Sequence, residues 1–111
     1  MEQGEVFLVN LDPTIGAEIK KTRPCVIVSN NMINRYRQIV VVVPLTSNVQ
    51  HLSPSHLFIP KGIANLDQDS KAVAEHIKSV DKRRLIHKIG ALPESYLDNL
   101  LLALNNTFAK L

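Results

Sequence analysis

The sequence has few of the residues on which several classes of protein depend. Its single cysteine, Cys25, cannot form an internal disulfide, and its position in an apolar run indicates a small core residue rather than a nucleophile. No apolar run approaches the roughly 20 residues of a membrane span. The first residues are acidic, whereas a secretion signal would be basic. We therefore expect a cytoplasmic protein without a membrane partner.

Low-complexity tracts and internal repeats are also missing. With 45% hydrophobic residues, the 111-residue chain fits one domain, residues 1–111, with a single core. Histidine, cysteine and acidic residues are not spaced as metal ligands, and Asp67-Gln68-Asp69 lacks the remainder of a calcium loop. The expected protein thus needs neither a metal ion nor another cofactor.

The positive charge is concentrated in two segments. Residues 20–37 carry a net charge of +5 and residues 78–88 carry +4, although the whole chain is only +3. The remaining residues must therefore carry a net charge of −6. Segregated positive charge of this kind is typical of proteins that bind a polyanion. The alternative is ordinary solvated charge on loops.

The apolar pattern predicts a mostly β domain followed by one helix. Apolar or β-branched runs predict strands at 5–11, 25–29, 38–44, 56–60 and 71–78, the second and third of them buried on both faces. Asparagines between the second and third strands predict a short helix or turn at 30–37. After Pro93, apolar residues at steps of three and four predict an amphipathic helix: Leu97, Leu100, Leu101, Leu104 and Phe108. A small barrel or half-open sheet capped by this helix follows.

The helix and the aromatic residues carry two further expectations. Leu102 and Ala103 lie outside the leucine stripe and leave room for a partner surface. Phe7, Phe58 and Phe108 follow the pattern of core residues. Tyr36 lies between Arg35 and Arg37, where it could stack on an RNA base or pack half-buried against the sheet.

Arg23 and Thr46 are the main candidates for chemistry, because each lies at an end of a predicted buried strand. A guanidinium that stays protonated, beside a hydroxyl, suits a phosphate group. Two alternatives are structural: an ion pair between Arg23 and Glu18, and a Thr46 hydroxyl that caps local backbone. The histidines have no neighbouring residues in the sequence that would form a catalytic group with them, and we expect His51, His56 and His87 to be exposed.

Six motifs, in this order and spacing, resemble the MazF/PemK/Kid family of toxins: Asn10-Leu11-Asp12-Pro13-Thr14, Gly16-Ala17-Glu18, Thr22-Arg23-Pro24, Val28-Ser29-Asn30, Pro44-Leu45-Thr46-Ser47 and Val80-Asp81-Lys82-Arg83-Arg84-Leu85. The resemblance implies an SH3-like barrel with a C-terminal helix. It also implies a homodimer, a cognate antitoxin partner, DNA binding together with that antitoxin, and a sequence-specific, metal-independent endoribonuclease that cuts single-stranded RNA. Many relatives carry serine where this chain has Ala17.

The resemblance assigns roles to individual residues. Arg23 and Thr46 correspond to the residues that serve the scissile phosphate, and Glu18 and Glu75 are the candidates for the general base. We expect the RNA to contact a further set of side chains around them: Lys20, Lys21, Thr22, Arg35, Tyr36, Ser47, His76 and Lys78.

RNA can be cut without a metal when its own 2′-hydroxyl attacks the adjacent phosphorus, leaving a 2′,3′-cyclic phosphate and a 5′-hydroxyl. That reaction needs a base and a positive group over the phosphate, which the residues above supply. Two other functions stay open. One is a non-catalytic barrel that binds a protein such as DNA gyrase, and the other is a plain RNA-binding module, which the basic segments fit equally well.

Overall fold

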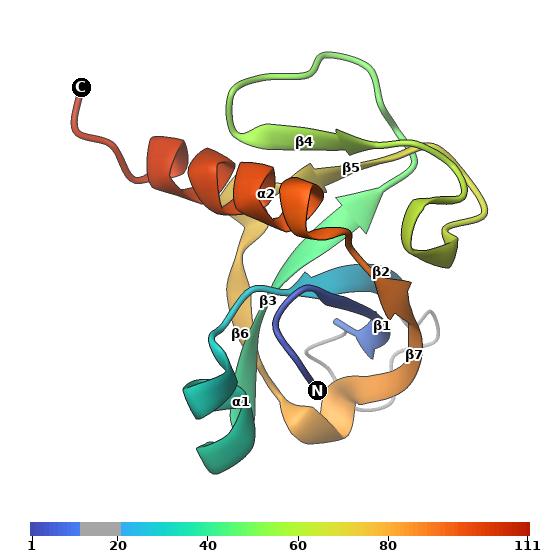
Figure 1. The fold of residues 1–111 in the computed structure, drawn as a ribbon, viewed down its shortest axis with the longest axis vertical. Coiled ribbons are helices and arrows are strands. Elements are labelled where there is room, and N and C mark those ends of the chain that lie inside the picture. Colours follow the sequence, from blue (N-terminus) through green and yellow to red (C-terminus); the bar gives the residue numbers. More distant parts are fainter. Residues whose placement is uncertain (12–20) are drawn as a thin grey trace.

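The computed structural model describes residues 1–11 and 21–111. Two α-helices, α1 (Asn31–Tyr36) and α2 (Glu94–Thr107), accompany the strands (Figure 1). Short 3₁₀ turns, η1 (Ile63–Asn65), η2 (Ala74–His76) and η3 (Lys82–Arg84), connect several of them. The strands are β1 (Glu5–Asn10), β2 (Thr22–Ile27), β3 (Ile39–Thr46), β4 (His56–Ile59), β5 (Ser70–Val73), β6 (Lys78–Asp81) and β7 (Leu85–Ala91).

The strands form one antiparallel sheet in the order β4-β5-β3-β2-β1-β7, with β6 also paired to β3. Strand β3 is the centre of this sheet. Along one edge it pairs with β2, and along the other its first half pairs with β6 and its last two residues pair with β5. Within the described residues β4 and β7 do not pair with each other, so the sheet is open rather than closed into a barrel. The predicted mostly β fold with a C-terminal helix is confirmed.

Side chains on both faces of β2 and β3 are buried, as their unbroken apolar runs predict. Val26 and Val43 belong to one core cluster, while Cys25 and Val42 belong to a second cluster on the other face. Residues of a strand alternate between faces, so a run without polar residues fits only a strand covered on both sides.

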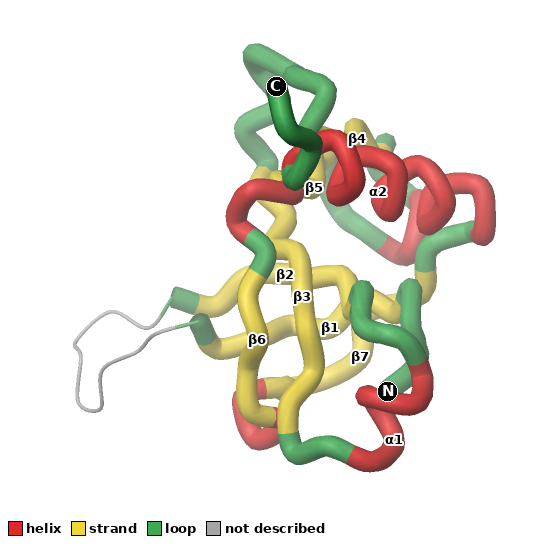
Figure 2. Tube along the Cα trace, turned by 90° about the vertical axis from the view of Figure 1, so that its left-hand side faces the viewer, coloured by secondary structure: helices red, strands yellow, loops and turns green. Residues whose placement is uncertain are grey.

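Helix α2 covers one end of the sheet. Leu100, Ala103 and Leu104 are buried and join the first core cluster. The helix lies across β4 and β5, while β1, β2, β3, β6 and β7 curve away from it (Figure 2). Leu102 on the helix and Phe108, which follows its last residue, are exposed.

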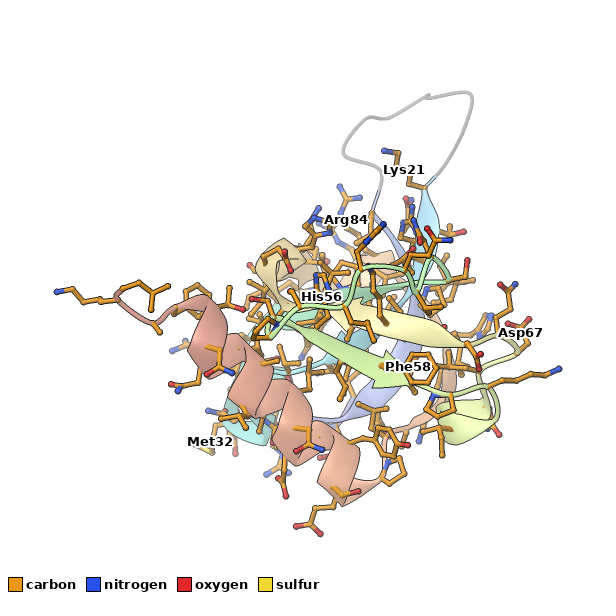
Figure 3. The ribbon with its side chains drawn as sticks, turned by 90° about the horizontal axis from the view of Figure 1, so that it is seen from above. Lys21, Met32, His56, Phe58, Asp67 and Arg84 are labelled. Carbon is orange, nitrogen blue, oxygen red and sulfur yellow. The ribbon has the colours of Figure 1, made fainter. Side chains whose placement is uncertain are left out.

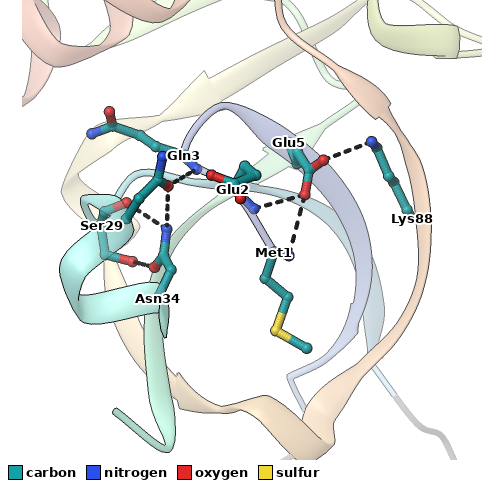
Figure 4. Close-up of polar contacts among 8 residues, drawn as sticks. Met1, Glu2, Gln3, Glu5, Ser29, Asn34 and Lys88 are labelled. Carbon is teal, nitrogen blue, oxygen red and sulfur yellow. Dashed lines mark hydrogen bonds and ion pairs between the residues drawn. The ribbon is translucent and has the colours of Figure 1, made fainter. Parts of the chain in front are cut away.

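The N-terminal residues are held by polar contacts on two sides (Figure 4). The Glu5 carboxylate accepts a hydrogen bond from the Glu2 amide at 2.7 Å and lies 2.6 Å from the Lys88 ammonium on β7. The Gln3 amide donates to the Asn31 side chain of α1 at 2.8 Å. Burial of the Glu5 carboxyl favours its neutral form, but the hydrogen bonds from Lys88 and Glu2 outweigh this effect. The pKa of Glu5 is therefore lowered.

Several local predictions were wrong. The single strand expected at 71–78 is two strands, β5 and β6, separated by η2, and β7 was not expected. Ala103 is buried and offers no surface to a partner. Phe58 and Phe108 are 37% and 67% exposed rather than core residues. The reason is shared: a pattern of apolar residues does not reveal which neighbouring element covers a given face.

Candidate functional site

A pocket of about 800 Å³ opens where β3 ends. It is bordered by the beginning of β2, the end of β3, and the segment from β5 through η2 to β6. The lining residues are Leu11, Lys21, Arg23, Pro44, Leu45, Thr46, Asn48, His56, Lys71, Val73, Glu75, His76 and Lys78.

The pocket is strongly cationic. Lys21, Arg23, Lys71 and Lys78 line it, whereas Glu75 is the one carboxylate among its described lining residues. The charged side chains come from two stretches of sequence, 21–23 and 71–78, so the fold itself brings the charges together. An excess of +3 in a concave site raises the local concentration of anions. This arrangement fits a phosphate-bearing ligand.

Arg23 is placed by strand pairing at the mouth of the pocket. Its backbone pairs with Val9 of β1, which fixes the position of the side chain close to the open end of β2. The residue is exposed, and among the described residues no carboxylate or carbonyl binds its guanidinium. Its five N–H donors are therefore available to a ligand that enters the pocket. The alternative ion pair with Glu18 falls outside the described residues.

Thr46 ends β3, and its hydroxyl oxygen accepts a hydrogen bond from the Asn48 amide at 3.2 Å. This contact is the local backbone cap that we considered above as a purely structural role for the Thr46 hydroxyl. A hydroxyl that accepts one hydrogen bond still has its own proton to donate. The cap thus fixes the oxygen in the pocket and leaves a donor for a phosphate oxygen.

The pairing of β3 explains why two predicted residues reach the pocket. Val42 pairs with Lys78 of β6, but the next pair along this edge is Leu45 with Ala72 of β5. Between these pairs the chain leaves the sheet in η2, which carries Glu75 and His76. Pro44, which lacks an N–H to donate, lies on β3 opposite this break. The break in pairing puts a carboxylate and an imidazole into the pocket.

Glu75 is in contact with a histidine that sequence reasoning placed on the surface. The His56 Nε2 atom lies 3.2 Å from Glu75 Oε1, and the His56 side chain is only 11% exposed. His56 Nδ1 accepts a hydrogen bond from the Ser53 amide at 3.1 Å. Since Nδ1 acts as the acceptor, the proton of the neutral ring is on Nε2 and is donated to Glu75. The second carboxylate oxygen has no partner among the described residues, and the side chain is 48% exposed.

Lys71 is a second residue that the sequence did not single out. Its side chain is buried, with 9% of the residue exposed, and its ammonium donates a hydrogen bond to the Gln50 carbonyl at 2.8 Å. Lys71 pairs directly with Thr46 across the two strands. In the sequence, Lys71 is a charged residue within a predicted strand. Such a residue is expected to face solvent, so nothing in the sequence indicates that it lines a pocket.

The remaining predicted residues divide into groups. Lys21, His76 and Lys78 line the pocket with Arg23, Thr46 and Glu75. Thr22 and Ser47 are exposed next to lining residues. Glu18 and Lys20 lie outside the described residues.

Arg35 and Tyr36 are exposed on α1, which precedes the first residue of β3, whereas the pocket is at the last. Seven residue steps of about 3.3 Å separate these strand ends by roughly 23 Å. The structure therefore does not bring these two residues together with the pocket.

Cys25 does not contribute a nucleophile. The residue is fully buried, and burial raises the pKa of its thiol to about 12. The neutral thiol that results is a core residue, as the sequence predicts. In residues 1–11 and 21–111, no three histidine, cysteine or acidic side chains come close enough to hold a metal ion. No helix in this part of the chain is long and apolar enough to span a membrane.

Comparisons with known proteins show the family to which the chain is similar. Residues 2–108 match the family model described as PemK-like, MazF-like toxin of type II toxin–antitoxin system. The chain is 37% identical over 105 residues to endoribonuclease MazF9 of Mycobacterium tuberculosis, spanning 90% of this chain and 89% of that protein. It is also 37% identical over 113 residues to endoribonuclease MazF of Staphylococcus epidermidis, spanning 96% and 94%.

Two solved structures share the fold. One is an endoribonuclease in complex with its cognate antitoxin from mycobacterial species, with a TM-score of 0.81 at 21% identity over 100% of this chain and 99% of that one. The other is MazE–MazF from Deinococcus radiodurans, also with a TM-score of 0.81 at 21% identity, over 96% and 94%.

Proposed function

We propose, from the premise that this chain belongs to the PemK-like, MazF-like toxin family of type II toxin–antitoxin systems, that its pocket cuts single-stranded RNA by metal-independent 2′-hydroxyl attack. The protein is an endoribonuclease and has an antitoxin as its partner. The proposed cleavage chemistry is supported mainly by the composition of the pocket, which is lined by the Thr46 hydroxyl, four cationic side chains and a single carboxylate.

In the proposed reaction, Arg23 and Thr46 bind the non-bridging oxygens of the scissile phosphate. The guanidinium and the hydroxyl proton stabilise the charge that develops on those oxygens as the phosphorus becomes five-coordinate. Both groups are held by strand ends rather than by a free loop, so little rearrangement is needed when the RNA binds.

Glu75 is the proposed general base. Its free carboxylate oxygen takes the proton of the 2′-hydroxyl while the O2′–P bond forms, and His56 keeps the other oxygen in place at 3.2 Å. The P–O5′ bond then breaks, and the leaving oxygen takes a proton from water. The products are a 2′,3′-cyclic phosphate and a 5′-hydroxyl. Glu18 is the other candidate for the base and lies outside the described residues.

The first test is incubation of the purified protein with a long defined RNA in EDTA, alongside Arg23→Ala. The matched control is Arg37→Ala, an exposed arginine at the far end of β3. We expect cuts at a short sequence motif that persist in Arg37→Ala, are lost in Arg23→Ala, and carry cyclic phosphate and 5′-hydroxyl ends. Absence of cutting by the wild-type protein would contradict the proposal and favour a toxin that binds a protein such as DNA gyrase.

The partners follow from the same pocket. We propose that an acidic segment of the antitoxin competes with RNA for the cationic lining and folds as it binds. An antitoxin complex that still binds RNA with unchanged affinity would contradict this. We also propose a cytoplasmic homodimer that uses α2 and neighbouring strands, where Leu102 and Phe108 are exposed. Sedimentation of a monomer at micromolar concentration would refute the dimer.

A further inference from the structure

We propose that His76 is the general acid of the cleavage reaction, the group that gives a proton to the leaving 5′-oxygen. The proposal rests on the function proposed above and gives His76 a role beyond the RNA contact expected from the sequence. Three observations carry it: the position of His76 in the pocket, its two free ring nitrogens, and its direction relative to Glu75.

His76 lines the pocket beside the other groups proposed for chemistry. It ends the 3₁₀ turn η2, and Arg23 and Glu75 line the same cavity. In the view of Figure 3, Lys21 marks the side of the pocket next to β2 and His56 marks the side on β4. A phosphate that enters this cavity meets an imidazole as well as a carboxylate.

The two histidines of the pocket differ in what their ring nitrogens contact. Both nitrogens of His56 are engaged, Nδ1 by the Ser53 amide at 3.1 Å and Nε2 by Glu75 at 3.2 Å. His76 is exposed, and in residues 1–11 and 21–111 neither of its nitrogens has a hydrogen-bond or ion-pair partner. Of these two histidines, His76 is the one whose N–H is available to a ligand.

The backbone of η2 directs Glu75 and His76 away from each other. A 3₁₀ helix has three residues per turn, so successive side chains point about 120° apart. Ala74, the first residue of the turn, is fully buried, and its amide donates to the Ser55 carbonyl at 2.9 Å. With Ala74 in the core, Glu75 and His76 leave the backbone in two different outward directions, and both are exposed.

The reaction needs groups on two sides of the phosphorus. The attacking 2′-oxygen and the leaving 5′-oxygen lie roughly in line on opposite sides of that atom, so the acid and the base must be separate groups. Glu75 is the proposed base for the 2′-oxygen. His76, which diverges from Glu75 within the same turn, can face the 5′-oxygen.

The other cations of the pocket are poorer proton donors. A guanidinium is not deprotonated in proteins, and an ammonium is a weaker acid than an imidazolium, whose ordinary ionisation falls near neutral pH. Arg23 and the lysines of the pocket thus supply charge, whereas His76 can also transfer a proton.

In the proposed step the P–O5′ bond breaks, its electron pair stays on the 5′-oxygen, and that oxygen takes a proton from the His76 imidazolium. The neutral ring then takes a proton from water. Water thus remains the final source of the proton, and His76 is the group that delivers it while the bond breaks. The proton of the 2′-hydroxyl goes to Glu75, as described above.

The test compares two RNA strands with the same mapped cleavage motif: the natural RNA, and one in which sulfur replaces the 5′-oxygen of the scissile bond. A thiolate needs no acid to leave, since a thiol has a pKa of about 8.5 and an alcohol has one close to that of water, about 15.7. The variants are Glu75→Gln and His76→Gln, the second of which keeps a donor for RNA but cannot transfer a proton. The control His87→Gln changes an exposed histidine outside the pocket.

On the natural RNA we expect His76→Gln to lower kcat by about 10²–10⁴, the usual contribution of a general acid, with KM nearly unchanged. On the sulfur-containing RNA its kcat should return to nearly the wild-type value. Glu75→Gln should stay slow on both strands, because the attacking hydroxyl is the same in each. His87→Gln should match the wild type on both.

A wild-type rate for His76→Gln on the natural RNA would overturn the assignment. Equal losses on both strands would also overturn it, since they would show that His76 acts by contacting RNA rather than by giving up a proton. A wild-type protein that cuts neither strand would contradict the proposed activity itself, and the assignment with it.

Discussion

The contact between His56 and Glu75 gives a prediction about catalysis that can be measured as a coupling. The Ser53 amide holds the ring so that Nε2 donates to the carboxylate at 3.2 Å. If Glu75 is the general base, the histidine acts through it by fixing its direction. Changing His56 should then reduce activity only while Glu75 is present.

The expected size follows from the exposure of the pair. A hydrogen bond to a charged group contributes about 1.5–3 kcal/mol. The Glu75 side chain is 48% exposed, so solvent screening places the value at the lower end. We therefore expect about a tenfold loss of kcat for His56→Phe, which keeps a ring but lacks the donor. For Glu75→Gln we expect a loss of about 10²–10⁴, the usual contribution of a general base.

The assay is cleavage of a fluorescent RNA at saturating and limiting concentrations for wild type, both single variants and the double variant. The double variant should be no slower than Glu75→Gln, since the histidine has nothing left to orient. His87→Phe, an exposed histidine outside the pocket, is the matched control. Two losses that simply multiply in the double variant would refute the coupling and show that His56 acts independently of Glu75.

Three further predictions concern the scaffold. Gly90→Ala would place a Cβ 2.3 Å from the Ala64 carbonyl oxygen. The resulting displacement of η1 should lower the free energy of unfolding by about 1–3 kcal/mol, which is measured as a lower urea midpoint, and an unchanged midpoint would show that η1 moves without cost. Cys25, whose thiol pKa burial raises to about 12, should react with a thiol reagent at pH 8 only at the rate of unfolding, and a fast native reaction would contradict its burial. Because the pKa of Glu5 is lowered by Lys88 and Glu2, the Glu5 carboxylate should stabilise the fold at pH 7, and this stabilisation should be lost as the pH falls through the pKa of Glu5 in the folded protein. The urea midpoints of wild type and Glu5→Gln should therefore differ more at pH 7 than at pH 3. An equal difference at both pH values would refute this.

The sequence predicted the parts of the fold that depend on local patterns. Unbroken apolar runs identified β2 and β3 as central strands, and the spacing of leucines after Pro93 identified α2. The division of 71–78 into β5, η2 and β6 was missed, because it depends on which edge of β3 each part pairs with. Such long-range pairing has no periodic signal in a single sequence.

The site was predicted to a similar extent. Arg23 and Thr46 could be identified from their residue types at strand ends, and the structure puts them in one pocket. His56 and Lys71 could not, since a histidine after a serine-rich loop and a lysine inside a strand are usually solvated. Only the register that joins β3, β5 and β4 shows that both face the pocket.

Strand β3 changes partners from β6 to β5 partway along its edge, and the pocket lies at that change. The groups proposed for chemistry on the phosphate, Arg23 and Thr46, belong to the strand ends of the central sheet. His56, which holds the carboxylate of the proposed base, belongs to the arm formed by β5 and β4. The pocket is thus assembled from two parts of the sheet, so a change in the angle of that arm would move the proposed base relative to the phosphate-binding groups without unfolding either part.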